Sequence, residues 1–148
     1  MKSKIFLPII LIISLLSCNS FTILREQITI SDLLITKERI DKSTNPAEAL
    51  LLKNSLSEKI LLLENLTVKD IVISTNVDYD FCVLADFLSA KGPIECYIYT
   101  KNIKRMSQLQ KGKSVITVKG EFKRYFSMLD NYYTKIEVTN SNITIKTE

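Results

Sequence analysis

Two stretches of this chain decide its fold: Ile94-Glu95-Cys96-Tyr97-Ile98 and, a little further on, Leu109-Gln110-Lys111-Gly112-Lys113-Ser114-Val115-Ile116-Thr117-Val118-Lys119-Gly120. In the first stretch apolar residues alternate with polar or aromatic ones, which predicts a strand that buries one face. The second begins where a helix ends and continues as a strand from Ser114, with Ile116 and Val118 pointing inward. Between them, residues 102–109 carry Ile103, Met106 and Leu109 at helical spacing, and Gly112 closes that helix.

Outside these stretches, β-branched and aromatic residues dominate from Lys59 onward, and the breaks between runs carry Asn, Asp, Gly or Pro. Five strands are predicted, over residues 60–74, 79–88, 94–100, 114–126 and 135–146. The first is long enough to bend, at Asn65 or at Lys69-Asp70, and the last carries a bulge at 140–142. With one helix between the third and fourth strands, the order is β-β-β-α-β-β, which is the order of an OB-fold barrel. The sequence therefore predicts a mainly β protein built on a small five-stranded OB-fold-type barrel.

The residues that precede the barrel, 31–57, are predicted to be helical. Ser31-Asp32 can cap a helix that begins at Leu33. Pro46 either ends that helix or opens a second one, since proline suits the first turn of a helix. One or two short helices are expected before a barrel that occupies residues 58–148.

The residues at 94–98 and 109–120 are similar to motifs of the tRNA-anti-like OB-fold family, which is found in many bacterial lipoproteins. The upstream segment 33–56 also resembles the leading helix of that family. The resemblance covers about residues 31–145. It implies an OB-fold in a protein that bacteria export.

The start of the chain has the pattern of a cleavable secretory signal. Lys2 and Lys4 precede an apolar run over residues 5–16, which is too short to span about 20 residues of bilayer. The run ends in Leu15-Leu16-Ser17-Cys18, which resembles the lipobox of bacterial lipoproteins. That resemblance implies acyl chains, including a palmitate, on Cys18. We expect a signal peptide at 1–17, a tether at 18–30 and a lipid-anchored protein in the cell envelope, facing the periplasm or the cell exterior.

Composition argues against catalysis and against a polyanion partner. The sequence has no His and only three Gly, so a Ser-His-Asp triad and a glycine-rich phosphate loop are excluded. Removal of residues 1–17 takes away two of 20 basic residues and none of 16 acidic ones, which leaves a net charge of about +2. Asp78, Asp80 and Asp86 are read as a solvated face rather than a metal site. We expect no enzyme activity, no cofactor and no bound metal.

The candidate ligand surface lies on and after the third strand. Because Ile94, Cys96 and Ile98 are expected in the core, the opposite face carries Tyr97 and Tyr99, and basic residues follow at Lys101, Lys104 and Arg105. In OB-folds this face and the neighbouring loops bind ligands, and aromatic rings beside cations can stack bases or sugars. The alternative is that the two tyrosines only cover the barrel or pack on the leading helix. For the second strand, either Cys82 and Leu84 or Phe81 and Val83 face inward.

The loop between the last two strands is a second candidate contact surface. It is unusually apolar and carries Met128, Tyr132 and Tyr133; the alternative is a plain hairpin turn at Asp130-Asn131. The expected function is a membrane-anchored binding module for an unidentified protein or envelope oligosaccharide. The alternatives are a nucleic-acid-binding OB-fold protein, against which the low net charge argues, and a structural envelope lipoprotein.

Cys82 and Cys96 lie in neighbouring strands, and export would permit a disulfide. If residues 90–93 form the turn, Cys96 faces Asp86 or Phe87 and lies about 13 Å from Cys82, beyond the roughly 7 Å limit for a bridge. Two separate reduced thiols in the core are therefore expected.

Overall fold

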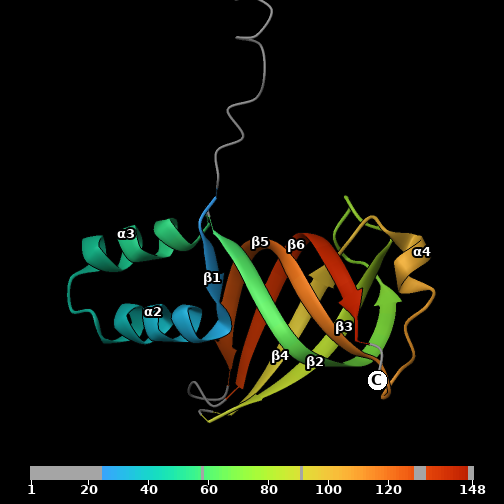
Figure 1. Ribbon diagram of the computed structural model, residues 1–148. Helices are drawn as coiled ribbons and strands as arrows, with labels where there is room; N and C mark the ends of the chain where they lie inside the picture. Colours follow the sequence, from blue (N-terminus) through green and yellow to red (C-terminus); the bar gives the residue numbers. More distant parts are fainter. Residues whose placement is uncertain (1–24, 58, 91, 129–132, 147–148) are drawn as a thin grey trace, which may run out of the picture.

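The computed structural model describes residues 25–57, 59–90, 92–128 and 133–146 (Figure 1). Six strands and three helices follow one another along this part of the chain. They are β1 (Gln27–Thr29), α2 (Ile30–Lys42), α3 (Pro46–Ser57), β2 (Ile60–Ile73), β3 (Phe81–Ser89), β4 (Gly92–Tyr99), α4 (Ile103–Met106), β5 (Val115–Met128) and β6 (Tyr133–Ile145).

Five of the strands close into a barrel. They pair in the order β2-β3-β4-β6-β5, and β5 pairs in turn with β2. All of these pairings are antiparallel except the one between β4 and β6, which is parallel. With α4 lying between β4 and β5, this is the strand order of an OB-fold. The predicted fold class is confirmed.

β2 bends because it takes part in two separate seams of the barrel. It pairs with β5 over Ile60 to Thr67 and with β3 over Thr67 to Ile73. The backbone of Asn65 is left-handed, with φ of 58°, and the β2–β3 register shifts between Val68 and Asp70, so that Lys69 is an extra residue. Both of the predicted bend positions are therefore used.

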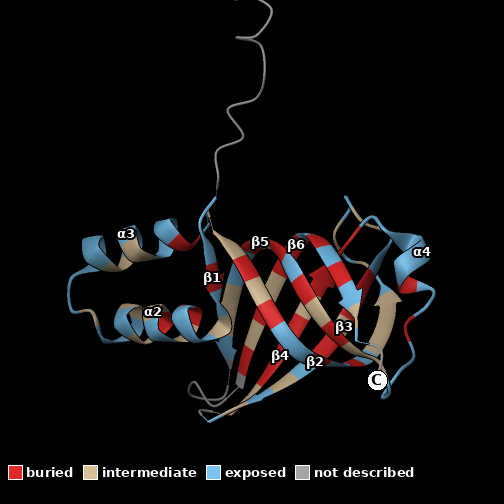
Figure 2. Ribbon diagram, viewed as in Figure 1, coloured by how far each residue is buried: buried red, intermediate tan, exposed pale blue. Residues whose placement is uncertain are grey.

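Buried residues recur along the barrel strands (Figure 2), and most of the apolar ones form a core cluster. Ile116 and Val118 are fully buried on β5, as are Cys96 and Ile98 on β4. On β3 the core residues are Val83 and Ala85, so the face of the strand that carries Val83 points into the barrel. Cys82 is buried on the opposite, outer face. Met106 and Leu109, on and after α4, complete the cluster.

The two cysteines are separate, as expected, but the pairing of their strands differs from the prediction. Cys96 pairs with Ala85, and Cys82 pairs with Tyr99; both thiols are free. The register is shifted because the ladder continues as far as Ser89 and Gly92, whereas the sequence predicts Gly92 in the turn. The two thiols consequently lie on opposite faces of the sheet, and only that of Cys96 belongs to the core cluster.

The helices α2 and α3 form a hairpin that projects from one side of the barrel (Figure 1). α2 begins at Ile30, earlier than predicted. Its cap is Thr29, whose hydroxyl accepts from the Asp32 amide while the Asp32 carboxylate accepts from the Thr29 amide at 2.9 Å. Pro46 opens α3, so there are two helices. None of the helices in the described ranges is both long and apolar enough to cross a bilayer.

The predicted tether of residues 18–30 is wrong at its end. Residues 27–29 form β1, which runs parallel to β2 and pairs with it from Ile60 to Leu62, and Ile28 is buried. The physical reason is an open edge: β3 pairs with β2 only from Thr67 onward, so the start of β2 has unpaired backbone groups on that side, and β1 satisfies them. Residues 18–24 lie outside the described part of the chain.

Candidate ligand-binding face

The outer face of β3, β4 and β6 brings together the side chains that surround the predicted tyrosines. Cross-strand pairing sets these side chains in three rows: Asp86, Glu95 and Lys135; Leu84, Tyr97 and Glu137; Cys82 and Tyr99. Neighbours within a row point to the same side of the sheet. β4 is the middle strand, so its side chains lie at the centre of this outer face.

Glu95 is the centre of a compact polar cluster on this face. Its side chain is only 8% exposed, and its carboxylate pairs with Lys69 Nζ at 2.8 Å and with Lys135 Nζ at 3.3 Å. The Tyr97 hydroxyl donates to the same carboxylate at 2.8 Å. Burial alone would raise the pKa of Glu95, but the hydrogen bonds from Lys69 and Tyr97 outweigh it and lower that pKa to about 2. The carboxylate therefore remains charged and holds the cluster together.

Tyr97 is fixed in place by this cluster. Lys135 Nζ donates to its hydroxyl at 2.8 Å and also lies 5.1 Å from the centre of its ring. The ring is partly exposed. Tyr97 can consequently meet a ligand as a pre-positioned side chain, at little cost in conformational entropy. Lys69, Glu95 and Lys135 were not among the predicted site residues, and the alternation of the strands gives no sign that a bulge brings Lys69 to Glu95.

Tyr99 does not lie on an open surface as the sequence suggested. It is only 4% exposed, because the loop between β2 and β3 folds over it. The ring of Tyr79, from this loop, is 5.4 Å from the ring of Tyr99 at an interplanar angle of 43°. Burial raises the pKa of Tyr99 to about 12. In this structure the loop covers Tyr99, and its assignment as a ligand contact stays a prediction.

We call residues 74–80, the loop between β2 and β3, the strap. Tyr79 holds the strap to β6: its hydroxyl donates to Asn140 Oδ1 at 2.8 Å and accepts from the Asn140 amide at 3.0 Å. Lys101 Nζ lies 5.9 Å from the centre of the Tyr79 ring. Of the predicted basic residues, Lys101 thus belongs with the strap. Tyr79 itself was not predicted as a site residue, because nothing near it in the sequence indicates a partner 61 positions away.

Lys104 and Arg105 lie on α4, the helix whose Met106 is buried in the core cluster at the end of the barrel. Both are exposed, and Arg105 Nη1 donates to Gln108 within the same segment at 3.2 Å. These two cations are not part of the cluster around Glu95. The structure therefore separates the predicted basic residues into two groups.

The predicted contact loop after β5 falls largely outside the described part of the chain. Met128 ends β5 and Tyr133 begins β6, but their side chains are not described, and Tyr132 lies in the segment 129–132. Just before it, Arg124 forms an ion pair with Glu137 at 2.6 Å and lies 4.9 Å from the ring centre of Phe126. Glu137 pairs with Tyr97 across β4 and β6, so its ion pair with Arg124 lies on the same outer face.

Two other features bear on the chemistry of the described residues. A hollow of about 150 Å³ lies away from Tyr97, between α2 and the β3–β4 hairpin, and is lined by residues that include Leu34, Lys37 and Pro93. Within the ranges that the structure describes, no three acidic or cysteine side chains gather as a metal site would require. The polar and aromatic side chains of the outer face are suited to binding a ligand through non-covalent contacts.

Comparison with protein-family profiles finds no match, and comparison with curated proteins finds none either. Among solved structures, the chain is similar to DNA binding domain A of S. cerevisiae Replication Protein A. The TM-score is 0.41 and the identity 10%, over 74% of this chain and 92% of that one. The barrel of this chain has the OB-fold strand order.

Proposed function

We propose that this chain is a membrane-anchored extracytoplasmic binding module, whose outer face around Tyr97 recognises a protein or an envelope oligosaccharide. The observation that carries the proposal is the charge balance of that face. Lys69, Lys135 and Arg124 each pair with a carboxylate of the barrel itself, Glu95 or Glu137. A polyanion would have to displace these carboxylates, whereas a neutral ligand can stack on the fixed ring of Tyr97.

The anchor in this proposal is Cys18. Arg25, where the described fold begins, lies seven positions after Cys18, and this length of chain spans at most about 25 Å when fully extended. An acylated Cys18 would hold the barrel close to the membrane surface. The lipobox-like sequence and the family resemblance to tRNA-anti-like lipoproteins support this part of the proposal.

Fractionation tests the anchor. We expect Cys18→Ala, once exported, to leave the membrane fraction after a salt wash, because the acyl chains supply the membrane affinity. The matched control is Cys82→Ala, which keeps the lipobox. A Cys18→Ala chain that still pelleted with washed membranes would contradict the lipoprotein assignment.

Photo-crosslinking in cells tests the binding face. Leu84 lies next to Tyr97 in the outer row, so a photo-reactive phenylalanine at position 84 should capture the ligand. The control position is Lys119, which is exposed on β5 and pairs with Leu62 and Asn142 instead. Capture from position 119 but not from 84 would refute this placement of the face.

A nucleic-acid ligand is the second candidate, and one observation favours it: Lys104 and Arg105 are both exposed on α4. Titration with a 20-nucleotide single-stranded DNA distinguishes the two candidates. If DNA were the ligand, affinity would fall steeply between low and physiological salt, because phosphate neutralisation releases counterions. For the proposed function we expect no saturable binding of this DNA at physiological salt.

A further inference from the structure

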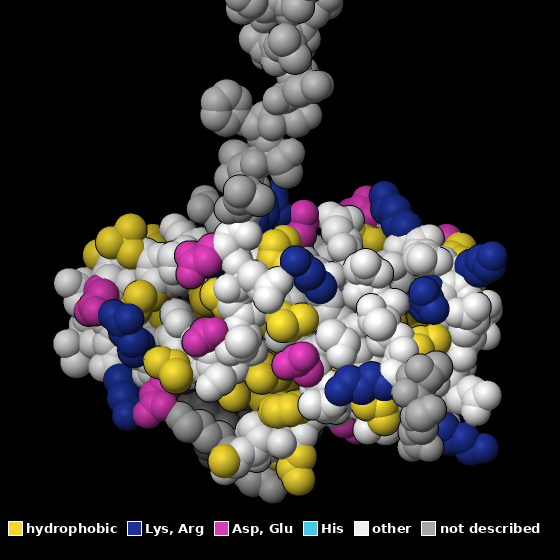
Figure 3. Space-filling view, in the orientation of Figure 1, with side chains coloured by type: hydrophobic (Ala, Val, Ile, Leu, Met, Phe, Trp, Pro, Cys, Tyr) yellow, Lys and Arg dark blue, Asp and Glu magenta, His cyan; other side chains and the backbone are white. Residues whose placement is uncertain are grey.

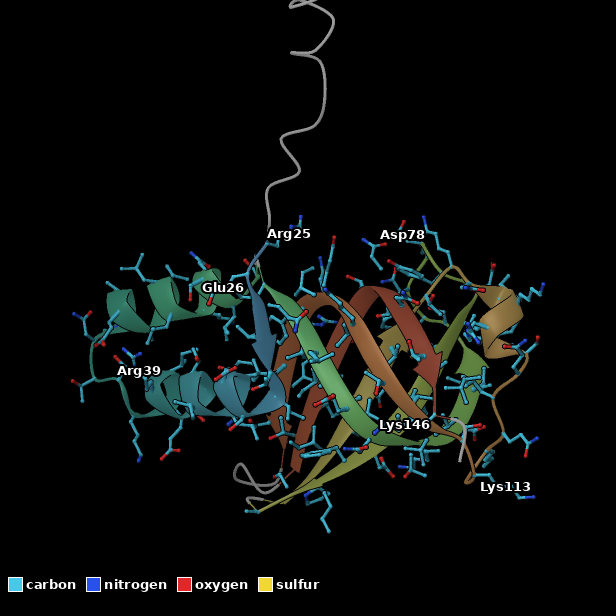
Figure 4. All side chains as sticks on the ribbon, viewed as in Figure 1. Arg25, Glu26, Arg39, Asp78, Lys113 and Lys146 are labelled. Atoms are coloured by element: carbon cyan, nitrogen blue, oxygen red, sulfur yellow. The ribbon has the colours of Figure 1, made fainter. Side chains whose placement is uncertain are left out.

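The strap places one of the chain's own side chains on the candidate binding face. Tyr79 lies against Tyr99, on the same outer face as Tyr97, and it reaches across to β6. Thr75 of the strap also forms a side-chain hydrogen bond with Tyr99, whereas the tip of the strap is open to solvent. Val77 is 99% exposed, and Asp78 and Asp80 are exposed as well. Figure 4 shows Asp78 at the rim of the barrel.

The surroundings of Tyr79 offer contacts both to the ring and to the hydroxyl of a phenol. The Tyr99 ring lies beside it in a tilted arrangement, and Lys101 lies near the ring. The hydroxyl both donates to and accepts from a single residue, Asn140. A ring without a hydroxyl would leave these two polar groups without that partner.

Asn140 is itself held in the orientation that receives a hydroxyl. Its backbone is left-handed, with φ of 48°, at the bulge of β6. Its Nδ2 donates to Glu121 Oε2 at 3.1 Å, and Glu121 Oε1 pairs with Arg25 at 2.7 Å. The side-chain amide of Asn140 therefore points its Oδ1 toward the Tyr79 hydroxyl. Glu121 and Arg25 hold this orientation, so it does not depend on Tyr79.

We propose that Tyr99, Asn140 and Lys101 form a subsite for a phenol ring, which Tyr79 occupies in the free protein and a tyrosine of a partner protein occupies in the complex. The proposal deepens and rests on the proposed function, since it selects a protein ligand and adds this subsite to the face around Tyr97. An intramolecular ring has a high effective concentration. The partner must therefore also contact Tyr97 or its neighbours in order to displace Tyr79.

Cys82 is a built-in reporter of an open strap. It pairs with Tyr99 on the outer face and is 2% exposed, and burial raises the pKa of its thiol to about 11. Cys96, fully buried in the core, is the internal control, because only global unfolding exposes it. N-ethylmaleimide labelling of the full chain, quantified at each cysteine by mass spectrometry, reads both sites in one sample.

Removal of the Tyr79 ring should open the subsite. We expect Tyr79→Ala to raise the labelling rate of Cys82 relative to Cys96 by roughly tenfold or more, and Tyr79→Phe to raise it by less, since only the hydrogen bonds are lost. If Tyr79→Ala labels both cysteines alike because it unfolds, Tyr79→Phe decides. A ratio unchanged in a folded Tyr79 variant would overturn the proposal.

Small phenols then test what the vacated subsite accepts. In Tyr79→Ala, 4-methylphenol, which is the tyrosine side chain itself, should slow Cys82 labelling back toward the parent rate, and toluene should do so less. Equal protection by toluene would overturn a phenol-specific subsite. Protection by methyl-β-glucoside but not by 4-methylphenol would overturn the choice of a protein partner. These measurements need no natural ligand, so they can fail while the proposed function stands.

Discussion

Replacement of Glu95 by Gln tests whether the buried carboxylate holds the outer face together. The pKa of Glu95 falls from its ordinary 4.5 to about 2, and a difference of this size corresponds to about 3 kcal/mol of folding free energy. Because the Lys69 side chain is 49% exposed, solvent screens part of the attraction, and we expect a loss of about 2 kcal/mol at pH 7. Gln keeps the shape but leaves Lys69 and Lys135 without this negative partner.

The pH dependence gives a sharper test than the loss itself. Since the folded pKa of Glu95 is depressed, its contribution is present above pH 4.5 and is lost as the pH falls toward 2. Urea unfolding, followed by circular dichroism from pH 7 to pH 2, should therefore show a difference between parent and Glu95→Gln that shrinks through this range. Glu64→Gln, at an exposed position of β2, is the control. A constant difference between parent and Glu95→Gln at all pH values would refute the reasoning.

Three further changes test other parts of the fold. Val118→Asp should abolish cooperative thermal unfolding, because it buries an unpaired charge in a fully buried position; a midpoint near the parent's would contradict the inward orientation of Val118. Gly120→Ala should lower the free energy of unfolding by about 1–3 kcal/mol in urea titration, because a Cβ there would lie 2.5 Å from Ser141 Oγ and 2.9 Å from the Thr139 carbonyl oxygen. Arg25→Ala should raise Cys82 labelling by no more than about fivefold, since an exposed ion pair only helps to orient the Asn140 amide through Glu121; an effect as large as that of Tyr79→Ala would be unexpected.

The barrel could be predicted from the sequence because each of its strands carries a local signal. Ile94, Cys96 and Ile98 alternate with polar and aromatic residues, and this period alone fixes which side enters the core. The spacing of Met106 and Leu109 likewise indicates α4 and its buried side. Such signals lie within a few residues of one another, so no knowledge of the tertiary structure is needed to read them.

The candidate site depends on pairs that are distant in the sequence. Tyr79 meets Asn140 across 61 positions, and Lys69 meets Glu95 across 26. β1 has the same character, since three residues form a strand only because the start of β2 has an open edge. The periodicity of one strand carries no information about such distant partners. The register of β3 and β4, which puts Cys82 and Cys96 on opposite faces, depends on whether Gly92 and Pro93 belong to the turn or to β4.

The departures from regular strand geometry that close this barrel also equip its outer face. In β2 the extra residue at the bend is Lys69, and a bulge re-aims its residue, here toward Glu95. In β6 the bulge opposite Gly120 puts Asn140 in a left-handed conformation, where both its amide and its side chain meet the hydroxyl of Tyr79. On the side of the barrel over β2 and β5, by contrast, acidic and basic side chains are mixed, and the basic ones are scattered rather than gathered in one patch (Figure 3). For the binding function that we propose, specificity should accordingly reside where the two bulges point, on either side of β4.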